Sequence, residues 1–160
     1  TPFGNFQEEQ MVSYKEFYSI GLLIAAQGAK YAFQNMPLVG AHCMGYHSQI
    51  MPNFKWNGCT AGISTLGITS NGNIVGCLSI GNDRFIEGNI RDQSLKSIWY
   101  NKDKFTYNRC FSKSDLGSFC RTCKFAISCR GGCNSVSYSV TKQFHNNPYC
   151  YYRIEKDVLK

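Results

Sequence analysis

Apolar residues at helical spacing mark the first element that the chain predicts. In residues 13–30, a Ser-x-x-Glu capping box precedes a segment whose apolar positions recur with a period close to that of a helix. We therefore expect a helix here, with Phe17, Ile20, Ile24 and Ala25 on its buried face. Two glycines within it either weaken the helix or permit close packing.

The middle of the chain changes character twice. Residues 35–58 contain two prolines, three glycines and little periodicity, which indicates irregular backbone. In residues 65–77, Leu66 and Ile68 alternate with small or polar neighbours ahead of Asn71-Gly72. Because this dipeptide favours a two-residue turn with positive φ, the segment predicts a β-hairpin.

The second half predicts short helical pieces. A short helix is expected over residues 92–101 and another over residues 149–160, at the end of the sequence. Residues 114–133 predict loops and single helical turns. Elements this short bury little apolar surface, so we expect an inorganic group to contribute to the stability of the fold.

Cysteine is the composition signal that changes this picture. The 160 residues contain nine cysteines, several times the usual share. They are Cys43, Cys59, Cys77, Cys110, Cys120, Cys123, Cys129, Cys133 and Cys150. A disulfide scaffold, a zinc module and an iron–sulfur protein all use many cysteines. The odd count and the lack of a visible signal peptide disfavour the first of these.

The spacing of the cysteines favours a metal centre. Between residues 120 and 133 they follow the pattern C-x2-C-x5-C-x3-C, and a C-x2-C turn lets two sulfurs face one centre. Cys77 ends the predicted hairpin, and Gly131-Gly132 allows close approach of backbone to a bulky group. We expect a small α+β, cysteine-rich domain with a β-hairpin and short helices, stapled by metal clusters and preceded by a helix.

The ordered cysteine pattern resembles that of the SPASM domain, the C-terminal extension of many radical S-adenosylmethionine enzymes that modify peptides and proteins. The pattern is C-x12-G-x4-C, then C-x2-C-x5-C-x3-C, then a final cysteine, and the resemblance covers about residues 41–155. The flanking words "CTAG", "SNGNIVGC", "EGNIRDQSLKSIW" and "CRGGC" match as well. The sequence is similar in character to maturases of ribosomally made peptides.

The resemblance implies two auxiliary [4Fe–4S] clusters with interleaved ligands. The second cluster would be held by Cys120, Cys123, Cys129 and Cys150. The first would be held by Cys59, Cys77 and Cys133. Its fourth position differs among family members, and here it is Cys43, Cys110 or an open iron that takes substrate. Cys43 is our preferred candidate, and a buried place under the Trp99 helix is the other interpretation of Cys110.

The radical-generating motif C-x3-C-x2-C does not occur in these 160 residues. His47 stands where Cys43 would need a partner, and Val136 stands where the motif from Cys129 would need its third cysteine. We therefore expect the chain to be inactive alone. Residues 1–40 would be the end of an upstream barrel with its linker helix, and 41–160 the iron–sulfur domain. S-adenosylmethionine and a third cluster would belong to the missing upstream domain.

The net charge and the lengths of the apolar runs indicate which kinds of partner the chain could have. The formal net charge of +7 would favour an anionic partner such as nucleic acid. The basic residues are scattered, and two clusters at about −2 each would lower the balance to about +3, so we expect no nucleic-acid partner. No run of eighteen apolar residues occurs, and we expect no membrane partner. The expected partners are a peptide or protein substrate, the upstream barrel and an external electron donor, in the cytoplasm.

A zinc-binding interaction module, using Cys120, Cys123, Cys129 and Cys150, is the alternative function. His145 lies in the turn signal "FHNNPY", and we expect it to be solvated.

Overall fold

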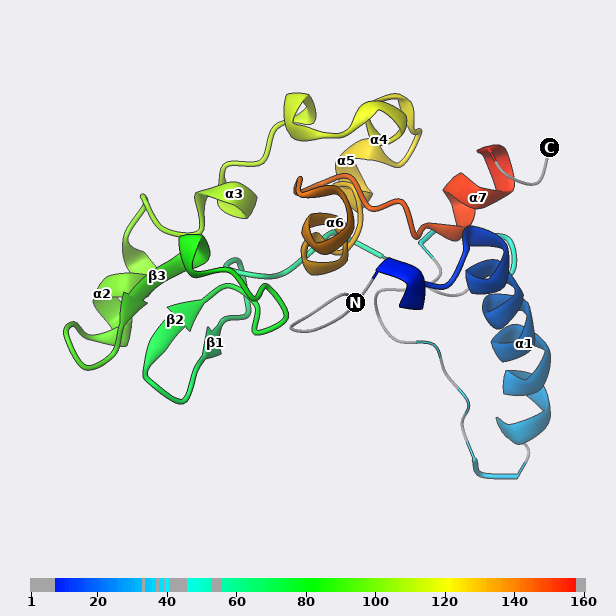
Figure 1. Cartoon of the computed structure of the whole chain (residues 1–160), viewed down its shortest axis with the longest axis horizontal. Helices are drawn as coiled ribbons and strands as arrows, with labels where there is room; N and C mark the ends of the chain where they lie inside the picture. Colours follow the sequence, from blue (N-terminus) through cyan, green and yellow to red (C-terminus); the bar gives the residue numbers. More distant parts are fainter. Residues whose placement is uncertain are drawn as a thin grey trace.

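The computed structural model describes residues 8–32, 34–36, 38, 40, 46–52 and 56–157. Its elements are the helices α1 (Tyr14–Ala32), α2 (Leu95–Tyr100), α3 (Thr106–Arg109), α4 (Ser118–Thr122), α5 (Ala126–Cys129), α6 (Asn134–Thr141) and α7 (Tyr151–Asp157), the 3-10 turns Glu8–Gln10, Asp83–Phe85 and Lys113–Asp115, and the strands β1 (Gly67–Ile68), β2 (Asn73–Val75) and β3 (Ile86–Asn89). The sheet and α2 lie at one end, α1 and α7 at the other, and α4–α6 between them (Figure 1). The predicted α+β class is confirmed.

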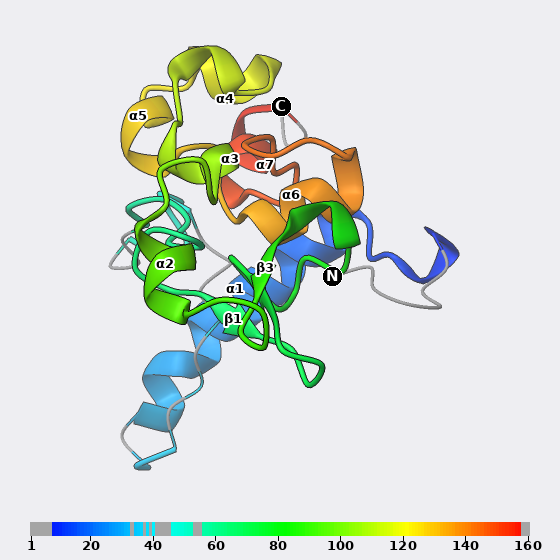
Figure 2. The same cartoon turned by 90° about the vertical axis from the view of Figure 1, so that its left-hand side faces the viewer.

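The helix α1 starts where the capping box predicts. The Ser13 backbone N–H donates to the Glu16 carboxylate at 2.7 Å, and the Glu16 N–H donates to Ser13 Oγ at 3.2 Å. These reciprocal bonds satisfy two backbone donors that the first turn would otherwise leave unpaired. The end of α1 far from α7 extends beyond the other described elements (Figure 2).

The buried face of α1 differs in part from the predicted one. Phe17 packs against Tyr151 of α7, with ring centroids 4.6 Å apart. Gly21 is buried beside the same ring, and a Cβ there would lie 2.5 Å from Tyr151 Cζ. Ile20, expected on this face, is 40% exposed, so that assignment is wrong. The contact is centred on a glycine because the tyrosine ring needs the space that a side chain would take.

A three-stranded antiparallel sheet forms the other end of the molecule. The hairpin of β1 and β2 is confirmed, with Ile68 opposite Ile74, but residues 69–72 connect the strands, which makes the loop longer than predicted. Gly72 has the positive φ of +89° that its position requires. β3 adds to the free edge of β2 and was not predicted. Ile74 packs with Ile98 and Phe105 in a fully buried cluster.

The remaining helices are short. α2 and α7 lie within the predicted segments, and the Ser94 side chain caps α2 by accepting the Ser97 N–H at 3.1 Å. α6 was not predicted, because its sequence NSVSYSVT offers few apolar positions. It is nevertheless buried through small polar residues, including Asn134, Ser135 and Ser137. In the described part of the chain, no helix is both long and apolar enough to cross a membrane.

Candidate metal centre

Thiols from three separate segments face one pocket in the C-terminal half. Cys120 lies in α4, Cys123 follows its last turn, Cys129 ends α5, and Cys150 directly precedes α7. All of them line one small pocket, with a cavity volume of about 20 Å³. The other lining residues are Tyr46, Phe119, Phe125, Ala126, Gly131, Gly132 and Asn147. The structure therefore brings together the four cysteines that the sequence grouped. We call this set the C-terminal thiol group.

The loop between α5 and α6 makes this convergence possible. Gly131 and Gly132 have positive φ values of 75° and 82°. A side chain at Gly131 would collide with the backbone of His145, so glycine allows the loop to approach the segment that leads to Cys150. The Asn147 N–H then donates to the Gly131 carbonyl at 3.0 Å, and this bond joins the loop between α5 and α6 to the segment before Cys150.

Burial makes these thiols costly to ionise. It raises the pKa of Cys129 and Cys150 to about 12 and that of Cys120 to about 11. Charge repulsion from neighbouring thiols adds to the effect. Thiolates crowded in this way are stabilised by a positive centre, and thiolates are the ligands of iron–sulfur clusters. The donor set and its burial fit such a group.

A second set of thiols lies beside α6. Burial raises the pKa of Cys59, and the nearby Cys133 and Cys77 raise it further. Backbone N–H groups of Ala61 and Asn134 donate to the Cys59 thiol and lower its pKa in part. The structure thus brings together the three cysteines assigned to the first cluster. We call this set the α6 thiol group.

The N-terminus of α6 completes the surroundings of the α6 thiol group. Cys133 is the N-cap of this helix, and its Sγ lies 3.1 Å from Ser135 Oγ. The positive end of the helix dipole and its free N–H groups favour negative charge on nearby sulfur. The Tyr46 hydroxyl accepts the Cys133 N–H and the Asn147 side-chain amide, each at 3.1 Å, and so links this region to the C-terminal thiol group.

The helix α3, which sequence reasoning missed, holds the loop that carries Cys59. The Asn108 side chain is fully buried, and its Nδ2 donates to the carbonyls of Cys59 and Ala61, both at 2.8 Å. Arg109 Nε donates to the Gly62 carbonyl at 2.6 Å. An asparagine at the start of a run "NRC" gives no sequence signal for this role, because its partners are carbonyls almost fifty positions away.

The candidates for the fourth position of the first cluster lie in different places. Cys43 falls outside the described residues. Cys110 is exposed at the C-terminal end of α3, where its N–H donates to Thr106. Its interpretation as a buried residue under the Trp99 helix is therefore wrong.

His145 is a second correction. It is only 2% exposed, and its ring nitrogens lie 2.8 Å from the Arg130 carbonyl and 2.7 Å from the Tyr107 carbonyl. It bridges the loop after α5 to α3. His47, by contrast, stacks on Phe125 with ring centroids 4.0 Å apart.

The described cysteines are all free thiols. Among the described residues, no group of three or more His, Cys, Asp or Glu side chains could hold a single metal ion. The four residues of the C-terminal thiol group nevertheless line one pocket.

Buried thiols arranged around such a pocket define a class of iron–sulfur proteins, and comparison with known proteins agrees. Residues 59–124 match the family model SPASM, an iron-sulfur cluster-binding domain. The matched segment contains Cys59, Cys77, Cys110, Cys120 and Cys123. The resemblance seen in the sequence is confirmed over these residues, which match the model of an iron–sulfur cluster-binding domain.

A curated relative is the AdoMet-dependent heme synthase of Methanosarcina barkeri (strain Fusaro / DSM 804), 31% identical over 97 residues. The alignment covers 60% of this chain and 26% of that protein. Native anSMEcpe with bound AdoMet shares the fold, with a TM-score of 0.61 and 16% identity over 97% of this chain and 42% of that one. The structure of native anSMEcpe with bound AdoMet and Cp18Cys peptide gives a TM-score of 0.57 and 17% identity, covering 97% and 43%.

Proposed function

We propose that this chain is the auxiliary cluster domain of a radical S-adenosylmethionine maturase and binds two [4Fe–4S] clusters. Cys120, Cys123, Cys129 and Cys150 would ligate one cluster. Cys59, Cys77 and Cys133 would ligate the other. The observation that carries this proposal is the lining of a single pocket by the C-terminal thiol group, with the α6 thiol group gathered separately.

Cys43 is the fourth ligand that we propose for the first cluster. Tyr46, three residues later, accepts the Cys133 N–H at 3.1 Å and packs against Cys133. Three residues span at most about 10 Å, a length that would allow Cys43 to reach the α6 thiol group. The exposed position of Cys110 makes it a weaker candidate. An iron left open at this position is the remaining alternative.

The bound clusters would exchange single electrons, and an open iron would bind a substrate atom as a Lewis acid. The protein groups keep the thiols desolvated and supply backbone N–H donors to sulfur. We propose that the domain relays electrons from an external donor, engages the substrate, or does both. Peptides bound in the anSMEcpe structures support a peptide or protein substrate.

Radical chemistry itself would belong to an upstream barrel that holds S-adenosylmethionine and a third cluster. We propose residues 1–40 as the end of that barrel and 41–160 as the iron–sulfur domain, in a cytoplasmic enzyme. The chain spans 42% of native anSMEcpe and 26% of the curated relative, which supports a larger parent protein. The packing of α1 on α7 would join the two parts.

Metal content tests the proposal directly. The chain is purified and reconstituted without oxygen, and iron, sulfide and zinc are quantified together with the absorption spectrum. We expect about six to eight irons per chain, matching sulfide and a brown protein. The alternative zinc module, which rests on the C-x2-C spacing, would give a colourless protein with stoichiometric zinc. Zero iron after reconstitution would overturn the proposal.

A further inference from the structure

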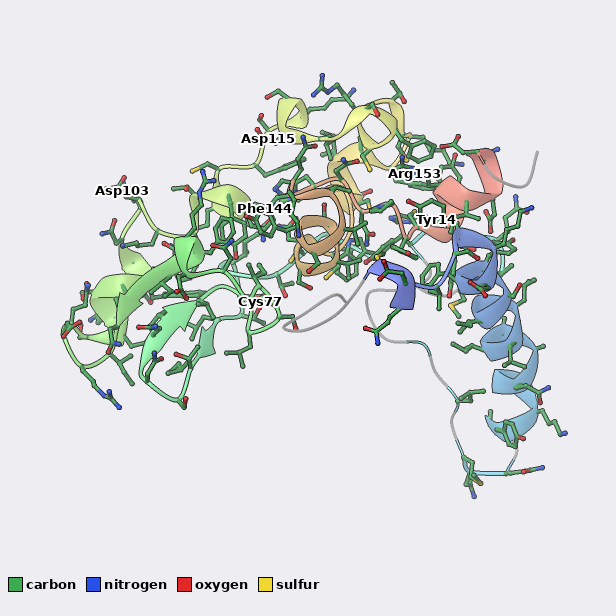
Figure 3. All side chains as sticks on the ribbon, viewed as in Figure 1. Tyr14, Cys77, Asp103, Asp115, Phe144 and Arg153 are labelled. Carbon is green, nitrogen blue, oxygen red and sulfur yellow. The ribbon has the colours of Figure 1, made fainter. Side chains whose placement is uncertain are left out.

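Tyr107 is held rigidly near the α6 thiol group. It lies in α3, and its ring stacks on Phe144 at 4.4 Å and contacts Phe85 edge-on at 5.9 Å. Its carbonyl lies 2.7 Å from a ring nitrogen of His145. Phe144 and Cys77 both lie at the end of the sheet that faces α6 (Figure 3). These contacts hold both the backbone and the ring of Tyr107 in place, and with them the position of its hydroxyl oxygen.

The hydroxyl of Tyr107 is buried and has no hydrogen-bond partner among the described residues. It sits against Gly76, where a Cβ would overlap it, and Gly76 directly precedes Cys77. Burial raises the pKa of Tyr107, and the nearby thiols of Cys59 and Cys77 raise it further. The phenol is thus a neutral donor close to these two cysteines. Leaving a buried donor without a partner is unfavourable, so its position calls for an acceptor.

We propose that the Tyr107 hydroxyl donates a hydrogen bond to a sulfur of the cluster bound at Cys59, Cys77 and Cys133, and thereby raises the reduction potential of that cluster. This inference rests on the proposed function. The absence of a side chain at Gly76 leaves room for the hydroxyl. The thiols of Cys59 and Cys77, which raise the pKa of the phenol, are the nearby sulfur ligands of this cluster.

The direction of the effect follows from charge. Reduction adds one negative charge to the cluster, and a hydrogen bond to sulfur stabilises the more negative state more strongly. Tyr107 therefore stabilises the reduced cluster through a hydrogen bond and is not one of its ligands. Removing its hydroxyl makes the cluster harder to reduce.

The test compares Tyr107→Phe with the matched variant Tyr138→Phe. Tyr138 packs in the same aromatic cluster, 4.9 Å from Phe85 and 5.1 Å from Phe144. Its hydroxyl instead accepts from the Asn82 side chain at 3.3 Å. Both variants are reconstituted in the complete protein, their iron is counted, and each cluster is titrated with spectroscopic detection. The signal that Cys77→Ser abolishes identifies the cluster of interest.

Tyr107→Phe should keep the iron content of the wild type and shift only this cluster to a more negative potential. Tyr138→Phe should shift neither cluster. An unchanged potential with full iron overturns the inference and leaves the proposed function intact, whereas a wild type without iron overturns the proposed function. Loss of one iron from this cluster in Tyr107→Phe would make the tyrosine a ligand and also overturn the inference.

A second measurement covers the case in which Tyr107→Phe does not fold. Gly76→Ala keeps the tyrosine but displaces its hydroxyl. It should shift the same cluster in the same direction, and an unchanged potential in this variant would count against the hydrogen bond.

Discussion

Three half-buried thiols of the C-terminal thiol group have pKa values raised above the usual 9.0 by desolvation, to about 11 for Cys120 and about 12 for Cys129 and Cys150. A thiol whose pKa is higher in the folded protein than in the unfolded chain contributes stability to the metal-free fold below the unfolded pKa. That contribution is lost as the pH rises through the folded pKa, because the unfolded chain then binds fewer protons.

We therefore predict that the free energy of unfolding of the reduced, metal-free protein falls steadily from about pH 9 to about pH 12. Denaturant unfolding at several pH values measures this slope. Cys129→Ser removes one raised thiol and should give a shallower slope, whereas the exposed Cys110→Ser should keep the wild-type slope. Equal slopes in all three proteins would contradict the prediction.

Local sequence signals were reliable at single residues only where the partners are close in sequence. The capping bonds of Ser13 and Glu16 and the left-handed Gly72 appeared as predicted. His145 and Cys110 were both misjudged, the first as solvated and the second as buried. The burial of His145 depends on carbonyls of residues 107 and 130, which no local pattern encodes.

At the scale of elements, the contact of α1 with α7 depends on one missing side chain. A Cβ at Gly21 would meet Tyr151 Cζ at 2.5 Å and Ile50 Cδ1 at 2.8 Å. Tyr151 is fully buried and cannot move aside at low cost. We predict that Gly21→Ala destabilises this contact by about 1–3 kcal/mol, the usual range for overpacking.

Hydrogen exchange of α1 and α7 in the metal-loaded protein measures this effect. Gly28→Ala in the same helix is the matched control, since its Cβ would meet only the Leu38 carbonyl at 3.1 Å. The gain in helix propensity, about 1 kcal/mol, should largely offset that contact. A Gly21→Ala protein with unchanged protection would show that Tyr151 can repack.

The one-turn helix α3 holds the Cys59 loop through Asn108. Asn108→Ala would leave the carbonyls of Cys59 and Ala61 without their donor, at a cost of about 1–3 kcal/mol. Asn108→Asp should be worse, because a carboxylate would face the same two carbonyls. Thermal unfolding of the iron-loaded protein measures both. Lys102→Ala, at an exposed turn position on the same segment, should change stability by less than about 0.5 kcal/mol.

Elements with strong local signals were predicted, and those formed by distant contacts were not. α1, the β1–β2 hairpin and α2 carry a capping box, an Asn-Gly pair and a capping serine respectively. β3 is a short segment, IEGN, whose strand state depends on pairing with β2. α3 is short and α6 is polar, and both depend on tertiary contacts. Asn108 of α3 bonds the Cys59 carbonyl, and α6 starts at Cys133. The gathering of the thiols could be anticipated from spacing and family resemblance only.

At the scale of the whole molecule, the loop at residues 129–133 connects the two thiol groups. Cys129 faces the C-terminal group and Cys133 the α6 group, although only three residues separate them. Among the described residues, buried apolar side chains form two small clusters, and Leu116, Tyr151 and Ile154 are buried outside them. Metal binding is then expected to contribute much of the folding free energy, as it does in other small metal-binding domains.

Two separate clusters and one shared centre predict different responses to the loss of Cys150. This cysteine directly precedes Tyr151, on which α1 packs. If each thiol group holds its own cluster, Cys150→Ser should reduce the iron content by up to about half and leave the cluster at Cys59 and Cys133 in place.

The helix α1 of the Cys150→Ser variant should also be cleaved faster by protease, because the segment that positions Tyr151 is no longer held by metal. Cys110→Ser should keep both the iron and the resistance to cleavage. Complete loss of iron in Cys150→Ser would instead mean that the two thiol groups assemble one centre, and the division of ligands proposed here would be wrong.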